Sequence, residues 1–292
     1  MNNLSNEELL EILRARLLKN EIEAPNLELI HELEKLSARL RTAERMKSSF
    51  LSHVRNELTN PVTSILGLSR HLAIGDLSNI AAIRHQARLL HREAFYLDYQ
   101  IRNITAAAEI EAGEIYPVPS MLDPHKLVDN VINAFKQRAQ IKNITLDVNT
   151  RGTNCTFTTD SYMLSIIVAN LVANAIEYSA DDSTICVDLQ LGKENLSVAI
   201  KDTGVGIDPR DHPRIFDRFS QLNEGTTRTH TGLGLGLSIV SEFAEALGGM
   251  IKVQSATGGG STFTLTLPAM QNADGQISNE WNEILFGDEK IF

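Results

Sequence analysis

Two long stretches of heptad-spaced apolar residues limit what this chain can fold into more than any other feature of its sequence. The first covers residues 29 to about 73, and the second covers about residues 78–112. Narrow apolar stripes with this spacing are typical of helices that pack against other helices. The link between the two stretches, which contains Gly75 and Asp76, is long enough only for a turn. The sequence therefore predicts a long antiparallel helical hairpin.

The apolar stripes also indicate how this hairpin is covered. The first stripe alternates four- and three-residue steps, with one charged interruption, along Leu29, Leu33, Leu36, Leu40, Ala43, Lys47, Phe50 and Val54. The second consists of two seven-residue repeats, Ile83, Leu90, Leu97 and Ile104, and Ala87, Ala94, Ile101 and Ala108. One hairpin cannot cover both stripes, so we favour a symmetric homodimer that forms a four-helix bundle. The alternative is a monomeric hairpin packed on a second domain.

Residues 50–69 of the first helix combine an apolar face with a dense polar face. The apolar residues recur at helical spacing, and Pro61 inside the pattern predicts a kink. The polar face carries groups that move or receive protons, namely His53, Arg55, Asn56, Glu57, Thr59 and Asn60. A polar cluster beside a kink suggests chemistry on the surface of this helix.

The composition excludes several classes of function. The net charge of -10 argues against binding nucleic acid, which needs an excess of Lys and Arg. We expect no membrane span and a cytoplasmic location, because no apolar run approaches about 18 residues and no apolar leader opens the chain. Cys155 and Cys186 lack metal-ligand spacing and are expected to be reduced. Residues 1–26 are expected to hold a short helix, with no room for a sensor domain.

The second half of the chain has a mixed α/β pattern. Gly113, Pro117 and Pro119 end the hairpin, so we place a domain boundary between residues 27–116 and 117–270. Beyond it we expect helices over residues 124–141, 161–178 and 235–247, and strands near residues 145–149, 156–158, 184–191, 197–202, 250–255 and 262–267. The expected fold class is therefore α+β, with the hairpin followed by an α/β two-layer sandwich. Residues 271–292 are expected to form a partly ordered acidic tail.

Three glycine clusters and one helix indicate nucleotide chemistry. A carboxylate at a strand end, Asp202, opens the first cluster and is able to accept a hydrogen bond from an amine while the following glycines close on a flat ring. The second cluster, residues 231–237, leads into a helix, where backbone amides bind phosphate. The third is residues 257–263. Asn170 and Asn174 lie one turn apart, and their amide oxygens suit a Mg2+ ion that bridges phosphates.

In this order the motifs resemble the sensor histidine kinases of two-component systems, whose ATP-binding fold (the Bergerat fold) is shared with gyrase, Hsp90 and MutL. The resemblance covers residues 30–268, and residues 215–219 resemble the family's phenylalanine box, followed by a lid over about residues 220–230. It implies that Asp202, with Gly206 and Thr262, reads the adenine amine and that Asn174 with Asn170 holds Mg2+. The full implied nucleotide-binding set is Asn170, Asn174, Asp202, Gly204, Gly206, Gly232, Leu233, Gly234, Gly236, Leu237 and Thr262.

Two positions depart from the family pattern. Glu177 stands where the family often has a lysine facing the phosphates, so its carboxylate is expected to weaken triphosphate binding or to turn away. Asn56 falls at the position of the phosphorylated histidine, with Glu57 at that of the general base and Asn60 at that of the residue that holds water in the phosphatase reaction. An amide nitrogen is not a nucleophile at neutral pH, so Asn56 cannot accept phosphate.

His53 is the alternative acceptor on this helix. It lies three residues upstream of Asn56, about 60° around the helix and ~4.5 Å along it. The favoured hypothesis is an ATP-binding dimer without the usual autophosphorylation, acting on a response regulator receiver domain as a phosphatase or regulating another histidine kinase. The alternative is an active kinase that phosphorylates His53 or a partner's histidine. A clamp of the gyrase or Hsp90 type is disfavoured, because the hairpin precedes the ATP domain and no transducer domain follows.

Overall fold

The computed structural model describes residues 24–74, 79–152, 156–192, 194–220 and 233–271. Its contacts divide the chain into two units, Met1–Ser52 and His53–Phe292, and each is considered by itself. The described part of the first unit is the beginning of one long helix. The second unit contains the rest of that helix, the second hairpin helix and the α/β domain. The expected N-terminal helix, the turn at Gly75 and Asp76, Cys155 and the tail lie outside the described residues.

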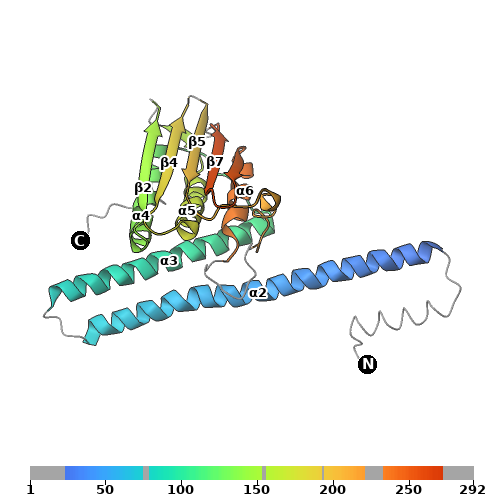
Figure 1. Ribbon diagram of the computed structural model, residues 1–292, viewed down its shortest axis with the longest axis horizontal. Helices are drawn as coiled ribbons and strands as arrows, with labels where there is room; N and C mark the ends of the chain where they lie inside the picture. The colour runs from blue at the N-terminus through green and yellow to red at the C-terminus, as the bar shows by residue number, and fades with distance from the viewer. Residues whose placement is uncertain (1–23, 75–78, 153–155, 193, 221–232, 272–292) are drawn as a thin grey trace. The chain divides into compact units, whose positions relative to one another are not determined.

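The two long helices predicted from the heptads are confirmed as α2, Ala24–Ile74, and α3, Ile80–Ala112 (Figure 1). Helix α2 continues through Pro61 without ending. Asn79 caps the start of α3, because its side chain accepts a hydrogen bond from the Ala82 amide at 3.1 Å. Gly113 ends α3 in the left-handed conformation, with a φ of 71°, which glycine adopts without steric cost.

A hydrogen bond between α2 and α3 fixes their register within the second unit. The Tyr96 hydroxyl donates to Glu57 Oε2 at 2.7 Å. Glu57 lies 17 residues before the end of α2, and Tyr96 lies 16 residues after the start of α3. Nearly equal distances from the connecting turn are the geometry of an antiparallel hairpin, as predicted.

The α/β domain has two layers, a five-stranded sheet and three helices. The strand order is β2 (Thr145–Arg151), β4 (Thr184–Leu191), β5 (Asn195–Lys201), β7 (Ser261–Pro268) and β6 (Met250–Ser255). Strands β2 and β4 are parallel, and the other neighbouring pairs are antiparallel. The helices are α4 (Pro124–Ile141), α5 (Ser161–Tyr178) and α6 (Gly236–Ala246) (Figure 1). The predicted two-layer α/β sandwich is confirmed.

The core of this domain lies between the sheet and the helices. In β4 the residues Ile185, Val187 and Leu189 are fully buried, while the residues between them are partly or fully exposed. This alternation shows that one face of the sheet is covered. Helix α5 is buried along almost its whole length. Among the described helices it is also the one long and apolar enough to cross a membrane, but 78% of its apolar window is buried in the domain core.

A second small sheet was not predicted. Strand β1, Ser120–Leu122, pairs antiparallel with β3, Phe157–Thr159. A strand of three residues beside two prolines is too short to produce a recognisable alternation, so the sequence indicated only a link there. The expected domain boundary at residues 116 and 117 falls between α3 and β1 and stays a prediction. The short 3-10 helix η1, Pro209–Asp211, lies within the loop after β5.

Candidate functional site

Asp202 follows β5 directly and lies at the centre of the candidate site. Its side chain is only 5% exposed, and its Oδ1 atom accepts hydrogen bonds from the amides of Gly204, at 2.8 Å, and Ser261, at 3.2 Å. Burial raises the pKa of Asp202, while these backbone donors act in the opposite direction. Among the described residues both bonds go to Oδ1, so Oδ2 keeps its lone pairs for a ligand. A fixed carboxylate of this kind is able to accept a hydrogen bond from an amine.

The glycines around Asp202 are required by the close approach of backbone segments. A Cβ atom on Gly204 would lie 2.2 Å from the Tyr178 carbonyl oxygen. A Cβ atom on Gly260 would lie 2.2 Å from the carbonyl oxygen of Asp202, and the φ of Gly260 is 73°. Gly206 likewise has a φ of 68° and would contact Ala256. The first and third glycine clusters therefore pack directly on one another around the carboxylate.

The structure favours Ser261 over Thr262 as the residue beside Asp202. Ser261 is buried on the covered face of the sheet, and its amide bonds to the carboxylate. Thr262 projects to the other face, where its neighbours across the sheet are Lys201 and Gln254, both exposed. Adjacent residues of a strand point to opposite faces of the sheet. A motif match that is uncertain by one residue therefore cannot decide whether the side chain faces Asp202 or the opposite side of the sheet.

Ser255 links the first glycine cluster to the third. Its hydroxyl donates to the Gly260 carbonyl at 2.7 Å and accepts from the Ile207 amide at 2.8 Å. The hydroxyls of Ser255 and Ser261 are 3.0 Å apart. These bonds hold the two loops at a fixed separation. Sequence reasoning missed Ser255, because a serine in a strand carries no distinguishing signal.

The second glycine cluster is described from Leu233 onward, and Gly232 lies outside the described residues. Leu233 is 6% exposed, and Leu237 is half-buried in the first turn of α6. Gly234 has a φ of 68°, and its carbonyl accepts a hydrogen bond from the amide of Phe219 at 2.9 Å. Phe219 belongs to the segment that resembles the phenylalanine box. Gly236 begins α6, so its backbone amide is one of the unpaired donors of a helix N-terminus.

The two asparagines of α5 have different environments. Asn170 is 1% exposed, and its amide group is fully hydrogen-bonded: Oδ1 accepts from the Tyr99 hydroxyl at 2.9 Å, and Nδ2 donates to Asn103 Oδ1 at 2.7 Å and to the Ile166 carbonyl at 2.9 Å. Asn174 is partly exposed, and its side chain makes no hydrogen bond within the described part of the chain. Asn174 is therefore the one of the two whose amide oxygen is open to a cation.

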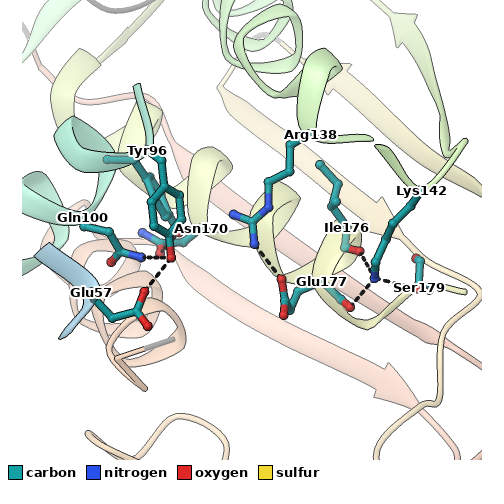
Figure 2. Close-up of polar contacts among 10 residues, drawn as sticks. Glu57, Tyr96, Gln100, Arg138, Lys142, Asn170, Ile176, Glu177 and Ser179 are labelled. Carbon is teal, nitrogen blue, oxygen red and sulfur yellow. Dashed lines mark hydrogen bonds and ion pairs between the residues drawn. The ribbon is translucent and has the colours of Figure 1, made fainter. Parts of the chain in front are cut away.

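Glu177 turns toward α4, which is one of the two expected outcomes for its carboxylate. Its Oε2 atom pairs with Arg138 Nη2 at 2.6 Å (Figure 2). Lys142, just after α4, reaches the C-terminal end of α5, where its ammonium group donates to the carbonyls of Ile176, Glu177 and Ser179 at 2.7 to 3.1 Å. A cation at this place complements the carbonyl groups left unpaired at a helix C-terminus.

Two of the candidate residues of α2, Asn56 and Asn60, are exposed. Glu57 is half-buried and accepts a hydrogen bond from the Tyr96 hydroxyl. The side chain of His53 lies outside the described residues. The Tyr96 hydroxyl also accepts from Gln100 Nε2 at 2.8 Å, and the Arg138 guanidinium lies 5.7 Å from the centre of the Tyr96 ring (Figure 2). Sequence reasoning missed Tyr96 as the partner of Glu57, and Gln100 and Arg138 as the neighbours of Tyr96, because they belong to other helices.

The residues present fit a nucleotide with a magnesium ion. The Asp202 carboxylate offers an open acceptor beside glycine backbones, and the start of α6 offers amide donors to an anion. The described residues form no group of three or more His, Cys, Asp or Glu side chains that could hold a metal ion. A magnesium ion bound here would take oxygen ligands from Asn174 and from the nucleotide.

Comparison with known proteins identifies the α/β domain first. Residues 159–271 match the family model described as histidine kinase-, DNA gyrase B-, and HSP90-like ATPase. The full-length ShkA structure in complex with AMPPNP shares the fold, with a TM-score of 0.54 and 23% identity over 77% of this chain and 47% of that one. The class of protein defined by fold and site is thus an ATPase domain of this type preceded by a helical hairpin.

Two relatives are similar to this chain beyond the ATPase domain. Hybrid signal transduction histidine kinase D of Dictyostelium discoideum is 30% identical over 90% of this chain and 17% of its own length. Sensor-like histidine kinase SenX3 of Mycobacterium tuberculosis is 32% identical over 81% of this chain and 56% of its own. This chain is similar to these histidine kinases over 81% to 90% of its own length. It spans about half or less of the length of these relatives.

Proposed function

We propose that this chain is an ATP-binding signalling module of the two-component type that does not phosphorylate itself at position 56. The observation that carries the proposal is a contrast between two sites. The open Oδ2 atom of Asp202 is suited to an adenine amine, whereas position 56, exposed on α2, holds an amide. Imidazole accepts a phosphoryl group and an amide does not. Nucleotide binding is therefore retained and the usual acceptor is absent.

Within the nucleotide site each group has a proposed role. Asp202 accepts the hydrogen bond of the adenine amine, supported by Gly206 and by Ser261 in place of Thr262. The amides at Gly234 and Gly236, next to the start of α6, bind the phosphates, together with Gly232. Asn174 supplies the protein oxygen for Mg2+. Both polar atoms of the Asn170 amide are already hydrogen-bonded, so we propose that Asn170 positions the site and does not ligate Mg2+ directly.

The proposed partners are a response regulator receiver domain and another histidine kinase. Glu57 and Asn60 are the groups that a phosphatase needs to hold water, and both remain on α2. Residues 80–92 carry three arginines and two histidines and no acidic residue, in a chain whose net charge is -10. A basic surface of this kind favours an acidic partner such as a receiver domain. We propose a cytoplasmic location, which the free thiol of Cys186 supports.

The second candidate function is an active kinase that uses His53, or a histidine of a partner, and passes the phosphoryl group to a receiver aspartate. The position of His53 on the same helix as Glu57 favours it. Incubation with γ-labelled ATP and Mg2+ separates the two functions. We expect saturable binding of AMPPNP by calorimetry and no acid-labile label on the wild type. Label that is lost in His53→Ala would show the second function, and absence of AMPPNP binding would contradict both.

The chain is proposed to form a homodimer through its hairpin. Val62 and Leu66 of α2 are 40% and 64% exposed, and Ile101 of α3 is 47% exposed. Apolar side chains left open along two helices favour burial against a second copy.

The Leu66→Asp variant is expected to weaken the dimer by on the order of 100-fold or more, because a two-fold axis places the charge in the interface twice. Analytical ultracentrifugation over a concentration series measures the dissociation constant. Ser64→Asp is the matched control, since Ser64 is exposed about 160° around α2 from Leu66. A monomeric wild type, or equal effects of the two variants, would contradict this interface.

A further inference from the structure

One face of α3 is polar where it meets the α/β domain and α2. It consists of Tyr96, Tyr99, Gln100 and Asn103, at the spacing i, i+3, i+4 and i+7, and is called here the polar face of α3. Gln100 and Asn103 are only 4% and 3% exposed. Ile101, which belongs to the apolar heptad stripe, lies about 140° around the helix from Tyr96 and remains open to a second copy. The polar face therefore has a role separate from dimerisation.

Two residues of the polar face, Tyr99 and Asn103, contact α5, the helix that carries Asn170 and Asn174. Tyr99 and Asn103 together occupy both polar atoms of the Asn170 amide. The Asn103 side chain is itself fixed, because its Nδ2 atom donates to the Tyr99 carbonyl at 3.1 Å. The Tyr99 ring packs edge-on against Phe135 of α4, with ring centres 5.6 Å apart. Asn170 is thus held in one orientation by groups of α3.

Asn170 also contacts the second glycine cluster. A Cβ atom at Gly236 would lie 2.7 Å from Asn170 Oδ1, so the backbone at the start of α6 rests directly on the asparagine amide. Helices α3 and α6 are close neighbours, and Ala106 of α3 is fully buried. The placement of the phosphate-binding end of α6 therefore depends on the placement of Asn170.

The other two residues of the polar face, Tyr96 and Gln100, position Glu57 of α2. The Tyr96 hydroxyl donates to Glu57, and Gln100, one turn further on, donates to the Tyr96 oxygen. Burial, and then the hydrogen bond to Glu57, raise the pKa of Tyr96, so the phenol stays a donor at neutral pH. Arg138 lies over the Tyr96 ring and pairs with Glu177, which follows Asn174 by one turn of α5. Glu57 is therefore linked to α5 through Tyr96, Arg138 and Glu177.

We propose that Tyr96 and Tyr99 are positioning residues that couple the nucleotide site to Glu57: Tyr99 fixes Asn170 on α5, and Tyr96 fixes Glu57 on α2. The inference rests on the proposed nucleotide site. Coupling between two sites is reciprocal, so a nucleotide that orders Asn170 also orders Glu57, and loss of either hydroxyl weakens the effect of one site on the other. Neither tyrosine is among the proposed nucleotide-binding residues.

The first test measures AMPPNP affinity of the full chain by calorimetry. Tyr99→Phe removes the donor to Asn170 and is expected to weaken binding about two- to tenfold, the net effect of one hydrogen bond. Tyr162→Phe is the matched control: Tyr162 is also a partly buried tyrosine, on α5 itself, and its hydroxyl makes no hydrogen bond within the described residues. The double variant Tyr99→Phe with Asn170→Ala is expected to bind no more weakly than Asn170→Ala alone.

The second test reads Glu57 without any enzymatic activity. Amide hydrogen exchange of residues 54–66 is compared with and without AMPPNP. In the wild type we expect slower exchange with nucleotide, and in Tyr96→Phe the same rate in both states. A role in stability alone would change both states equally. Absence of binding to the wild type would overturn the proposed function and the coupling together. Normal binding with no nucleotide effect on α2, or with an unchanged Tyr99→Phe affinity, would overturn the coupling alone.

Discussion

The Asp202→Asn variant is expected to lose at least about 100-fold in affinity for ATP while it folds normally. The asparagine has the shape of the aspartate, so its Oδ1 atom keeps the bonds from the Gly204 and Ser261 amides. Its Nδ2 group, however, takes the place of the open carboxylate oxygen and faces the adenine amine donor to donor. A buried site that loses a matched hydrogen bond in this way discriminates strongly.

Calorimetric titration with AMPPNP measures the loss, and a nucleotide with a hypoxanthine base provides the sharper test. Hypoxanthine carries a carbonyl oxygen where adenine carries the amine, so Asp202→Asn should prefer it to adenine, reversing the preference of the wild type. Asp188→Asn serves as the control, because Asp188 lies on the uncovered face of β4. Unchanged ATP affinity in Asp202→Asn would remove Asp202 from the site.

The pH dependence of binding follows from the same residue. Burial raises the pKa of Asp202 above the ordinary value of 3.8. A raised carboxyl pKa means that the folded state binds the proton more tightly than the unfolded state does. The free energy of unfolding therefore falls as the pH rises from 3.8 through the raised pKa of Asp202. Asp202→Asn removes this cost, because asparagine carries no charge. Binding of the amine needs the charged form. ATP affinity is therefore expected to fall as the pH is lowered through the raised pKa.

The fold was predictable because its signals are local. Heptad spacing predicted α2 and α3. The predicted starts of α4 and α5 agree with the caps in the structure, where Asp123 and Asp160 accept hydrogen bonds from the first amides of each helix. The alternation of buried and exposed residues in β4 is a local pattern of the same kind. Strand β1 was not predictable, since its three residues are held only by pairing with β3, and pairing between distant segments leaves no pattern in a segment so short.

The site was predictable at its motifs and not at its contacts. Asp202 and the glycines stand at the characteristic spacing of the motifs, so the sequence alone identified them as candidates. The choice between Ser261 and Thr262 depends on which face of β7 each residue occupies, and that is set by register with β5. The Arg138 partner of Glu177 comes from α4.

The polar face of α3 was hidden for a related reason. Polar residues on a heptad helix are normally solvated, so Tyr99 and Asn103 gave no sign that they bind Asn170. Their burial depends on the packing of the hairpin against α4 and α6. No spacing within α3 alone records that packing.

The Asn56→His variant is expected to gain acid-labile phosphate from γ-labelled ATP, to ~10-fold or more above the wild type. Position 56 is exposed and precedes Glu57, so a histidine there is accessible and has a carboxylate beside it to accept its proton. General-base assistance typically contributes on the order of 100-fold or more, so adding Glu57→Gln should remove most of the gained label. Gel autoradiography after acid and alkaline treatment measures it. His53→Ala in the same background is the control and should leave the label unchanged.

No gain of label in Asn56→His, with normal AMPPNP binding, would show that the side chain at position 56 is not what prevents phosphorylation. The cause would then be geometric, and the hydrogen bond from Tyr96 to Glu57 would be the first contact to remove.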